Sequence, residues 1–167
     1  MSLCIGLFGT CGNTTFRQDL FVPTYEQNDM AYYNPQVEDW TPDCAKEEAN
    51  HLANDQIIAF PVTSETYGIG SLAEVGFSIL NAIKLDDRRD FIVMIDEKLD
   101  DELMEDKDRA KESLRARQLV LAHLKKLNYS NIFLVDCFED MLELSLVCFN
   151  QKKEMARYRK FNPSNRG

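Results

Sequence analysis

The sequence predicts a doubly wound α/β fold of the flavodoxin/Rossmann-like type, with a parallel five-stranded sheet and helices on both faces. Short, continuous apolar runs such as 91-FIVMI-95 have the length and β-branched content of strands that are buried on both faces. Segments with helical apolar periodicity separate these runs, as the crossovers of a parallel sheet require. With 167 residues, the chain is long enough for one domain to bury a core without disulfides.

The elements follow from this alternation in chain order. The predicted strands cover residues 3–8, 31–34, 56–62, 91–95 and 131–135. The predicted helices cover residues 44–54, 71–84, 101–127 and 138–160. We therefore expect a single domain over residues 1–160, followed by a flexible tail at 161–167.

Composition narrows the class of partner. The formal net charge is −9, which repels a phosphate backbone and favours a small-molecule ligand over a nucleic acid. No apolar run approaches the ~20 residues that cross a bilayer, so no membrane partner is expected. Five dispersed cysteines without CxxC spacing favour reduced thiols and a cytoplasmic location, and two isolated histidines predict neither a metal site nor a cofactor.

In a doubly wound fold, ligands bind beyond the carboxyl ends of the strands, where strand order reverses. The candidate loops are therefore 9–15, 34–40 and 63–71. The first loop lacks the lysine of a phosphate-binding P-loop. The third contains Gly68 and Gly70 in partial GxGxxG spacing, but 63-TSETY-67 separates them from the preceding strand, which disfavours dinucleotide binding.

Glu74, in 68-GIGSLAEVGFSI-79, has two interpretations. With Ser71 three residues earlier, it matches a capping box at a helix start, and Ser71 is expected to cap in either case. Alternatively, it lies in the first helical turn, away from the apolar stripe, where the helix dipole favours an ionised carboxylate. Such an anion at a strand-end crevice is able to stabilise or capture an oxocarbenium-like sugar carbon.

Four segments together resemble the nucleoside 2-deoxyribosyltransferase-like family over roughly residues 3–95: 8-FGTCG-12, 34-NPQVEDW-40, 54-NDQIIAFPV-62 and 70-GSLAEVGFSI-79. The resemblance implies an enzyme that cleaves the N-glycosidic bond of a (deoxy)nucleoside or its 5′-monophosphate. It implies that Glu74 is the nucleophile and that Asp55 helps to position the nucleoside, which makes these two the expected catalytic residues. The substrate contacts it implies, together with neighbouring loop residues, are Gly9, Thr10, Asn34, Asp39, Trp40, Glu65, Tyr67, Gly68, Gly70 and Ser71.

The chain also departs from this family. The better-known transferases have a second Asp shortly before the nucleophile, where this chain has Gly68, and Glu65 or Tyr67 is the candidate substitute. They also have a Tyr in the first loop region, where this chain has Leu7.

Several alternatives stay open at this point. Transfer to another base and hydrolysis share their first half-reaction, and the sequence does not separate them. A non-catalytic nucleotide-binding module and a phosphate-binding flavodoxin-like domain are the rival functions. Phe77, outside the main apolar stripe, and the family resemblance predict a homo-oligomer. Arg117 falls inside an apolar helix stripe, which predicts a structural ion pair, a 5′-phosphate contact or a subunit contact.

Overall fold

The computed structural model describes residues 3–37, 39, 41–85 and 89–162. Five parallel strands form one sheet, as predicted, and their order is β2-β1-β3-β4-β5. The strands are β1 (Ile5–Leu7), β2 (Tyr32–Tyr33), β3 (Ile57–Val62), β4 (Asp90–Ile95) and β5 (Ile132–Leu134). β3 is buried along its whole length, which explains its continuous apolar sequence IIAFPV.

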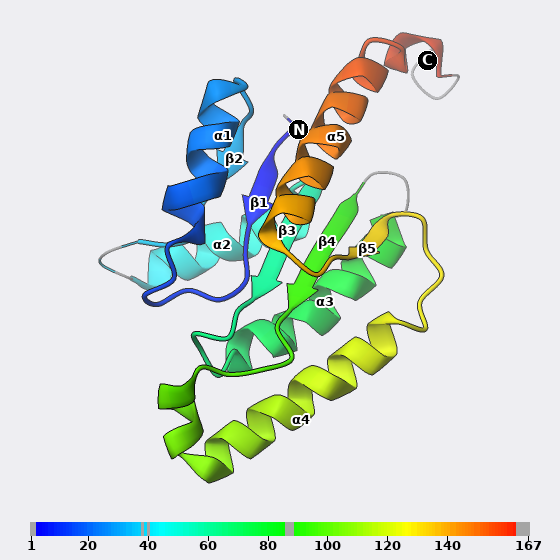
Figure 1. Ribbon diagram of the computed structural model, residues 1–167. Coiled ribbons are helices and arrows are strands. Elements are labelled where there is room, and N and C mark those ends of the chain that lie inside the picture. The colour runs from blue at the N-terminus through cyan, green and yellow to red at the C-terminus, as the bar shows by residue number, and fades with distance from the viewer. Residues whose placement is uncertain (1–2, 38, 40, 86–88, 163–167) are drawn as a thin grey trace.

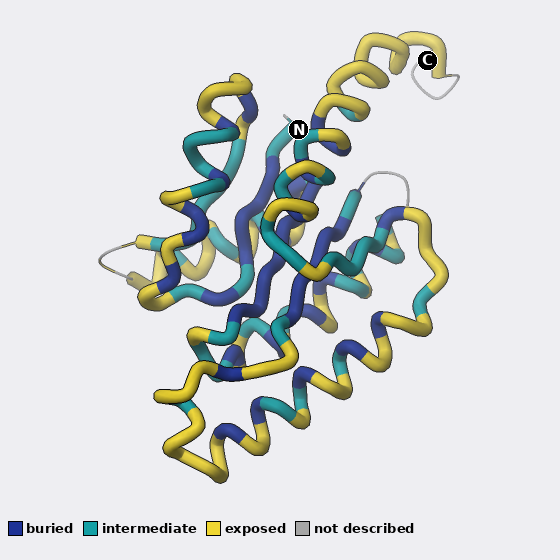
Figure 2. The backbone as a smooth tube through the Cα atoms, viewed as in Figure 1, coloured by how far each residue is buried: buried dark blue, intermediate teal, exposed yellow. Residues whose placement is uncertain are grey.

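The α-helices are α1 (Val22–Gln27), α2 (Pro42–Asn54), α3 (Ile69–Leu85), α4 (Lys107–Leu124) and α5 (Phe138–Ala156). Short non-α turns also occur: η1 (Arg17–Phe21), η3 (Asp101–Glu105) and η4 (Arg159–Phe161). Figure 1 shows the helices arranged on both sides of the sheet. One core cluster joins the sheet to α1 and α5, and the other joins it to α2, α3 and α4. Figure 2 shows the buried strands between these partly exposed layers.

Several elements differ from the prediction. The helical segment η1–α1 was not predicted. Pro23, at the start of α1 directly after η1, disfavours a continuous helix in this stretch. The long helix predicted for residues 101–127 is broken at Asp106, whose side chain caps α4 by accepting from the Arg109 N–H over 3.2 Å. The last helix ends at Ala156 instead of residue 160.

The strand order locates the crevice. β1 and β3 are neighbours, and the chain leaves them toward opposite edges of the sheet, so the switch point lies at their carboxyl ends. The loops that begin at Phe8 and Thr63 therefore border this crevice. None of the helices among the described residues is both long enough and apolar enough to cross a membrane.

Candidate functional site

Glu74 lies in the second turn of α3, because the helix starts at Ile69, two residues earlier than predicted. Gly68, with φ 63°, precedes the helix, and its carbonyl accepts from the Leu72 N–H over 2.8 Å. The first turn contains no acidic residue. The predicted Ser71–Glu74 capping box is therefore wrong: Ser71 is inside the helix, and Glu74 is too far along to reach a free N–H at its start.

The Glu74 carboxyl is partly buried, and burial raises its pKa above the ordinary value of 4.5. The negative charge of Glu48 raises the pKa of Glu74 further, so the two carboxyls are electrostatically coupled. Within the described residues, no group donates a hydrogen bond to Glu74. A partly buried carboxylate without such a donor is available to a ligand.

Glu48 lies on α2, and its environment differs from that of Glu74. Burial raises the pKa of Glu48, whereas the positive charge of Arg17 lowers it. Cys11, in the first loop, is coupled to the same groups. Burial raises the pKa of its thiol, the positive charge of Arg17 lowers it, and the charges of Glu48 and Glu74 raise it. We call Cys11, Arg17, Glu48 and Glu74 the crevice cluster.

Arg17 is fully buried below the first loop; its three nitrogens donate to main-chain carbonyls, and the guanidinium also has a side-chain hydrogen bond with Cys11. Its Nε reaches the Leu7 oxygen over 3.1 Å, its Nη2 the Phe8 oxygen over 2.7 Å and its Nη1 the Thr10 oxygen over 2.8 Å. These bonds fix the path of the chain as it leaves β1. They also keep a positive charge buried within the crevice cluster.

Arg117 holds the third loop in the same way. The side chain is fully buried, and its Nη atoms donate to the oxygens of Val62 (3.1 Å), Asp96 (2.9 Å), Thr63 (2.8 Å) and Thr66 (2.6 Å). The predicted roles in a side-chain ion pair, a phosphate contact or a subunit contact do not fit this guanidinium. Its Nη donors are taken up by main-chain oxygens, and its Nε donates to the Ser113 hydroxyl over 3.3 Å. Arg117 fixes the carboxyl ends of β3 and β4 instead.

The first-loop residues Gly9 and Thr10 have structural partners on β3. Gly9 has φ 93°, and a Cβ there would come within 2.1 Å of the Pro61 oxygen. The Thr10 N–H donates to that same oxygen over 2.9 Å, and the Thr10 and Thr63 hydroxyls are 3.0 Å apart. Both residues thus bind the loop to β3, and Thr10, 1% exposed, has its hydroxyl engaged inside the protein.

The second-loop residues differ in their surroundings. Asn34 accepts from the Gln36 N–H over 3.0 Å, which shapes the turn after β2. The Gln36 side-chain amide donates to Gly12 over 3.0 Å and so connects the first two loops. Asp39 is exposed, and Trp40 lies outside the described residues.

The third-loop residues have different surroundings. The Tyr67 hydroxyl donates to the Leu103 oxygen over 2.9 Å, beside Arg109, while Glu65 is exposed. Gly68 is buried, and a Cβ there would meet Val62 at 2.8 Å. Gly70 is exposed, and a Cβ there would meet no atom within 4 Å. The Tyr67 hydroxyl is thus engaged within the protein, whereas the Glu65 carboxylate is open to solvent.

Asp55 lies at the other end of the sheet from Glu74. It follows α2 and precedes β3, whereas Glu74 comes after β3, and six strand residues span roughly 20 Å. Asp55 is 7% exposed, and its carboxylate pairs with His51 Nδ1 at 3.0 and 3.1 Å. The structure does not bring the two expected catalytic residues into one site.

Sequence reasoning missed Glu48, although a signal was present. Cys44, Glu48, His51 and Asp55 recur on α2 at helical spacing and form one polar stripe. A polar stripe on a helix that covers a sheet indicates polar neighbours. Here those neighbours are Arg17 at the crevice end and Tyr33 beside His51.

A hollow of about 370 Å³ occurs elsewhere, against α4 and η3. Its lining combines basic and apolar side chains and one amide: Met104, Lys107, Ala110, Lys111, Leu114, Arg115 and Gln118. It contains no carboxylate and no residue of the three crevice loops. Its size suits a small ligand, but its chemistry offers neither a nucleophile nor a general acid.

Models of known protein families give no match to this chain, and curated protein sequences give none either.

Proposed function

We propose that the protein cleaves the N-glycosidic bond of a (deoxy)nucleoside or nucleoside 5′-monophosphate, with Glu74 as nucleophile. The observation that carries this proposal is that Glu74 is a partly buried carboxylate without a hydrogen-bond donor among the described residues, at the switch point of the sheet. The charge of a second carboxylate, Glu48, acts on it. The sequence resemblance to the nucleoside 2-deoxyribosyltransferase-like family supports the same residue. A capping role, its main competitor, does not fit where α3 begins.

The reaction follows a double displacement. A Glu74 oxygen bonds to C1′ while the C1′–N bond breaks, and the electron pair leaves with the base, which takes a proton from the Glu48 carboxyl. Water or a second base then attacks C1′ and passes its proton to Glu48. The C1′–O bond breaks, and its electron pair returns to Glu74.

Burial raises the pKa of both carboxyls, and only for Glu48 does a positive charge, that of Arg17, act against this rise. Arg17 favours the ionised form of Glu48, and burial favours its protonated form, so this group is suited to exchange a proton during the cycle. Arg17 and Arg117 fix the loops on either side of the crevice, which holds the carboxylates in place.

The experiment is a base-release screen over nucleosides, deoxynucleosides and their monophosphates, with and without an acceptor base. Glu74→Gln is expected to lose base release by orders of magnitude while it keeps the fold. Glu143→Gln, a change at an exposed position of α5, is the matched control and keeps full activity. Wild-type turnover that survives in Glu74→Gln would contradict the proposal. Binding without turnover on every substrate would favour a nucleotide-binding module instead.

We also propose that the protein forms a homo-oligomer in the cytoplasm through the outer face of α3. Ile69 is 67% exposed, and Phe77 and Leu80 are each 50% exposed, which is unusual for large apolar side chains on one helix. Light scattering of the wild type and of Phe77→Ser tests this, and a monomeric wild type would refute it.

A further inference from the structure

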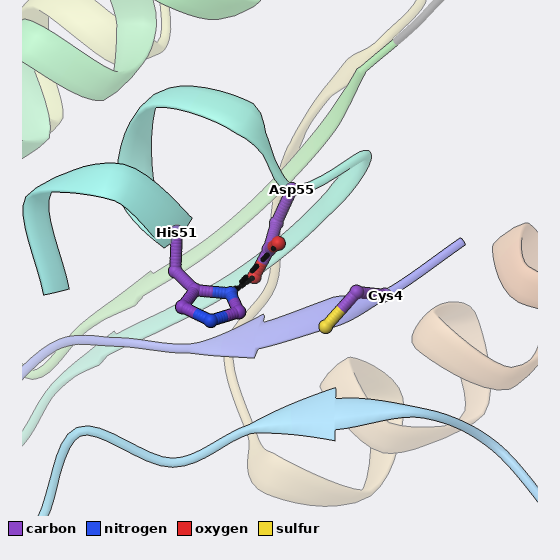
Figure 3. A group of neighbouring side chains, drawn as sticks. All are labelled: Cys4, His51 and Asp55. Atoms are coloured by element: carbon purple, nitrogen blue, oxygen red, sulfur yellow. Dashed lines mark hydrogen bonds and ion pairs between the residues drawn. The ribbon is translucent and has the colours of Figure 1, made fainter. Parts of the chain in front are cut away.

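Three side chains of metal-binding type converge at the amino end of the sheet, away from the crevice cluster. Cys4 directly precedes β1, His51 lies in the last turn of α2, and Asp55 follows that helix. Figure 3 shows the three side chains directed toward one another. One potential ligand atom from each lies within 4.8 Å of the others.

We propose that Cys4, His51 and Asp55 form a Zn²⁺ site that ties the start of β1 to the end of α2. Thiolate, imidazole and carboxylate are the three protein ligands that Zn²⁺ uses, and three protein ligands leave a fourth position for water. The bond lengths of such a site place ligand atoms about 3.4–3.6 Å apart around a tetrahedron. The observed limit of 4.8 Å needs only a small contraction, and the 3.0 Å His51–Asp55 contact a small expansion.

The surroundings already orient the ligands. The His51 ring stacks on Tyr33, with ring centroids 3.8 Å apart and planes inclined by 5°, so its nitrogen is held toward Asp55. Fixed rotamers of this kind are what the groups around a metal ligand supply. Gly6 leaves room above the carboxylate, since a Cβ there would come within 3.0 Å of Asp55 Oδ2.

The site is independent of the proposed enzymatic chemistry. Glu48 and Asp55 are seven residues apart on α2 and its end, which corresponds to about 10 Å along the axis. Binding replaces the Cys4 S–H by an S–Zn bond, and the proton leaves to solvent. His51 coordinates through Nδ1 with its proton on Nε2, and with a side chain 27% exposed it lets water reach the fourth position.

The test uses reduced, chelator-treated protein without a histidine tag, titrated with Co²⁺ as a spectroscopic substitute for Zn²⁺. We expect one Co²⁺ per chain with a thiolate-to-cobalt charge-transfer band, which added Zn²⁺ removes. Cys4→Ser loses the band, and His51→Gln weakens Co²⁺ binding by more than about tenfold, the range found when only a supporting group is lost. Cys137→Ser, a change at another partly exposed cysteine, is the matched control and keeps the band.

Thermal unfolding gives a second readout. Zn²⁺ raises the Tm of the wild type and of Cys137→Ser with increasing concentration, because it binds the folded chain, and it does not raise the Tm of Cys4→Ser. If Cys4→Ser unfolds without metal, the effect of Zn²⁺ on the Tm is compared between the wild type and His51→Gln instead. A wild type without the thiolate band, or a band that survives in Cys4→Ser, would overturn the site. The acidic surface also binds cations, but it produces no thiolate band.

Discussion

Arg117 and Thr66 are joined by a hydrogen bond of 2.6 Å, from guanidinium Nη2 to a main-chain oxygen of the loop that leads into α3. The same guanidinium reaches three further oxygens at the ends of β3 and β4. The position of Glu74 therefore depends on a residue that is far from it in sequence.

Arg117→Met is expected to lower the free energy of unfolding by about 3–5 kcal/mol, because several buried carbonyls lose their donors at once. Urea unfolding measures the loss. Arg115→Met, an exposed change on the same helix, is the control and changes stability by no more than about 0.5 kcal/mol. Equal stability of the two variants would show that water replaces the Arg117 bonds at little cost.

Gly9→Ala is expected to cost about 2–4 kcal/mol, because the new Cβ meets the Pro61 oxygen and the backbone has φ 93°. Gly12→Ala is the matched control, with φ 82° and no atom within 4 Å of its Cβ, and it costs about 1 kcal/mol. The difference between the two, measured by thermal unfolding, isolates the contact with Pro61. If both variants lose the same free energy of unfolding, the backbone conformation alone explains why glycine occurs at position 9.

Glu74→Gln is expected to stabilise the protein at neutral pH by up to about 1 kcal/mol, the usual scale of a single substitution. The pKa of Glu74 is raised in the folded state, so the folded chain binds the proton more tightly and loses stability as pH rises from 4.5 through that raised pKa. Glutamine removes this penalty. Tm measured against pH shows the gain above the raised pKa and none below 4.5; a constant difference across pH would contradict the cause.

Glu48→Gln is expected to lower the pKa of Glu74, because it removes a negative charge that disfavours a second one nearby. Carboxyl-carbon NMR titration measures the shift directly and needs no activity. Glu47→Gln, an exposed neighbouring change, is the control and leaves the pKa of Glu74 in place. If Glu48→Gln leaves the pKa of Glu74 unchanged, the two carboxyls do not interact, and Glu48 has no place in the proposed mechanism.

The fold was predictable because its information is local. Apolar runs such as 57-IIAFPV-62 are too short and too continuous for anything but buried strands, and the parallel order follows from the helices between them. The location of Asp55 at the end of the sheet opposite the crevice was also predictable, since a residue that precedes a parallel strand lies at the amino end of the sheet. The family resemblance around Asp55 had instead implied a place beside Glu74.

The sites required the third dimension. Cys4 and His51 are separated by 47 positions, so no spacing rule for metal ligands joins them. The buried guanidinium of Arg17 has main-chain partners, which leave no trace in the pattern of side chains. In the sequence, Glu48 appears only as part of a polar stripe on α2. The role of that stripe depends on which residues α2 packs against in the folded chain.

The choice of arginine to anchor both loops has a consequence for how the crevice responds to acidity. A guanidinium keeps its proton throughout the range in which carboxyls and thiols titrate, even where burial lowers its pKa, as it does for Arg17 and Arg117. The walls of the crevice thus retain their shape while Glu48 and Glu74 gain or lose protons between them. Acidity changes the charge of this site and leaves its architecture intact.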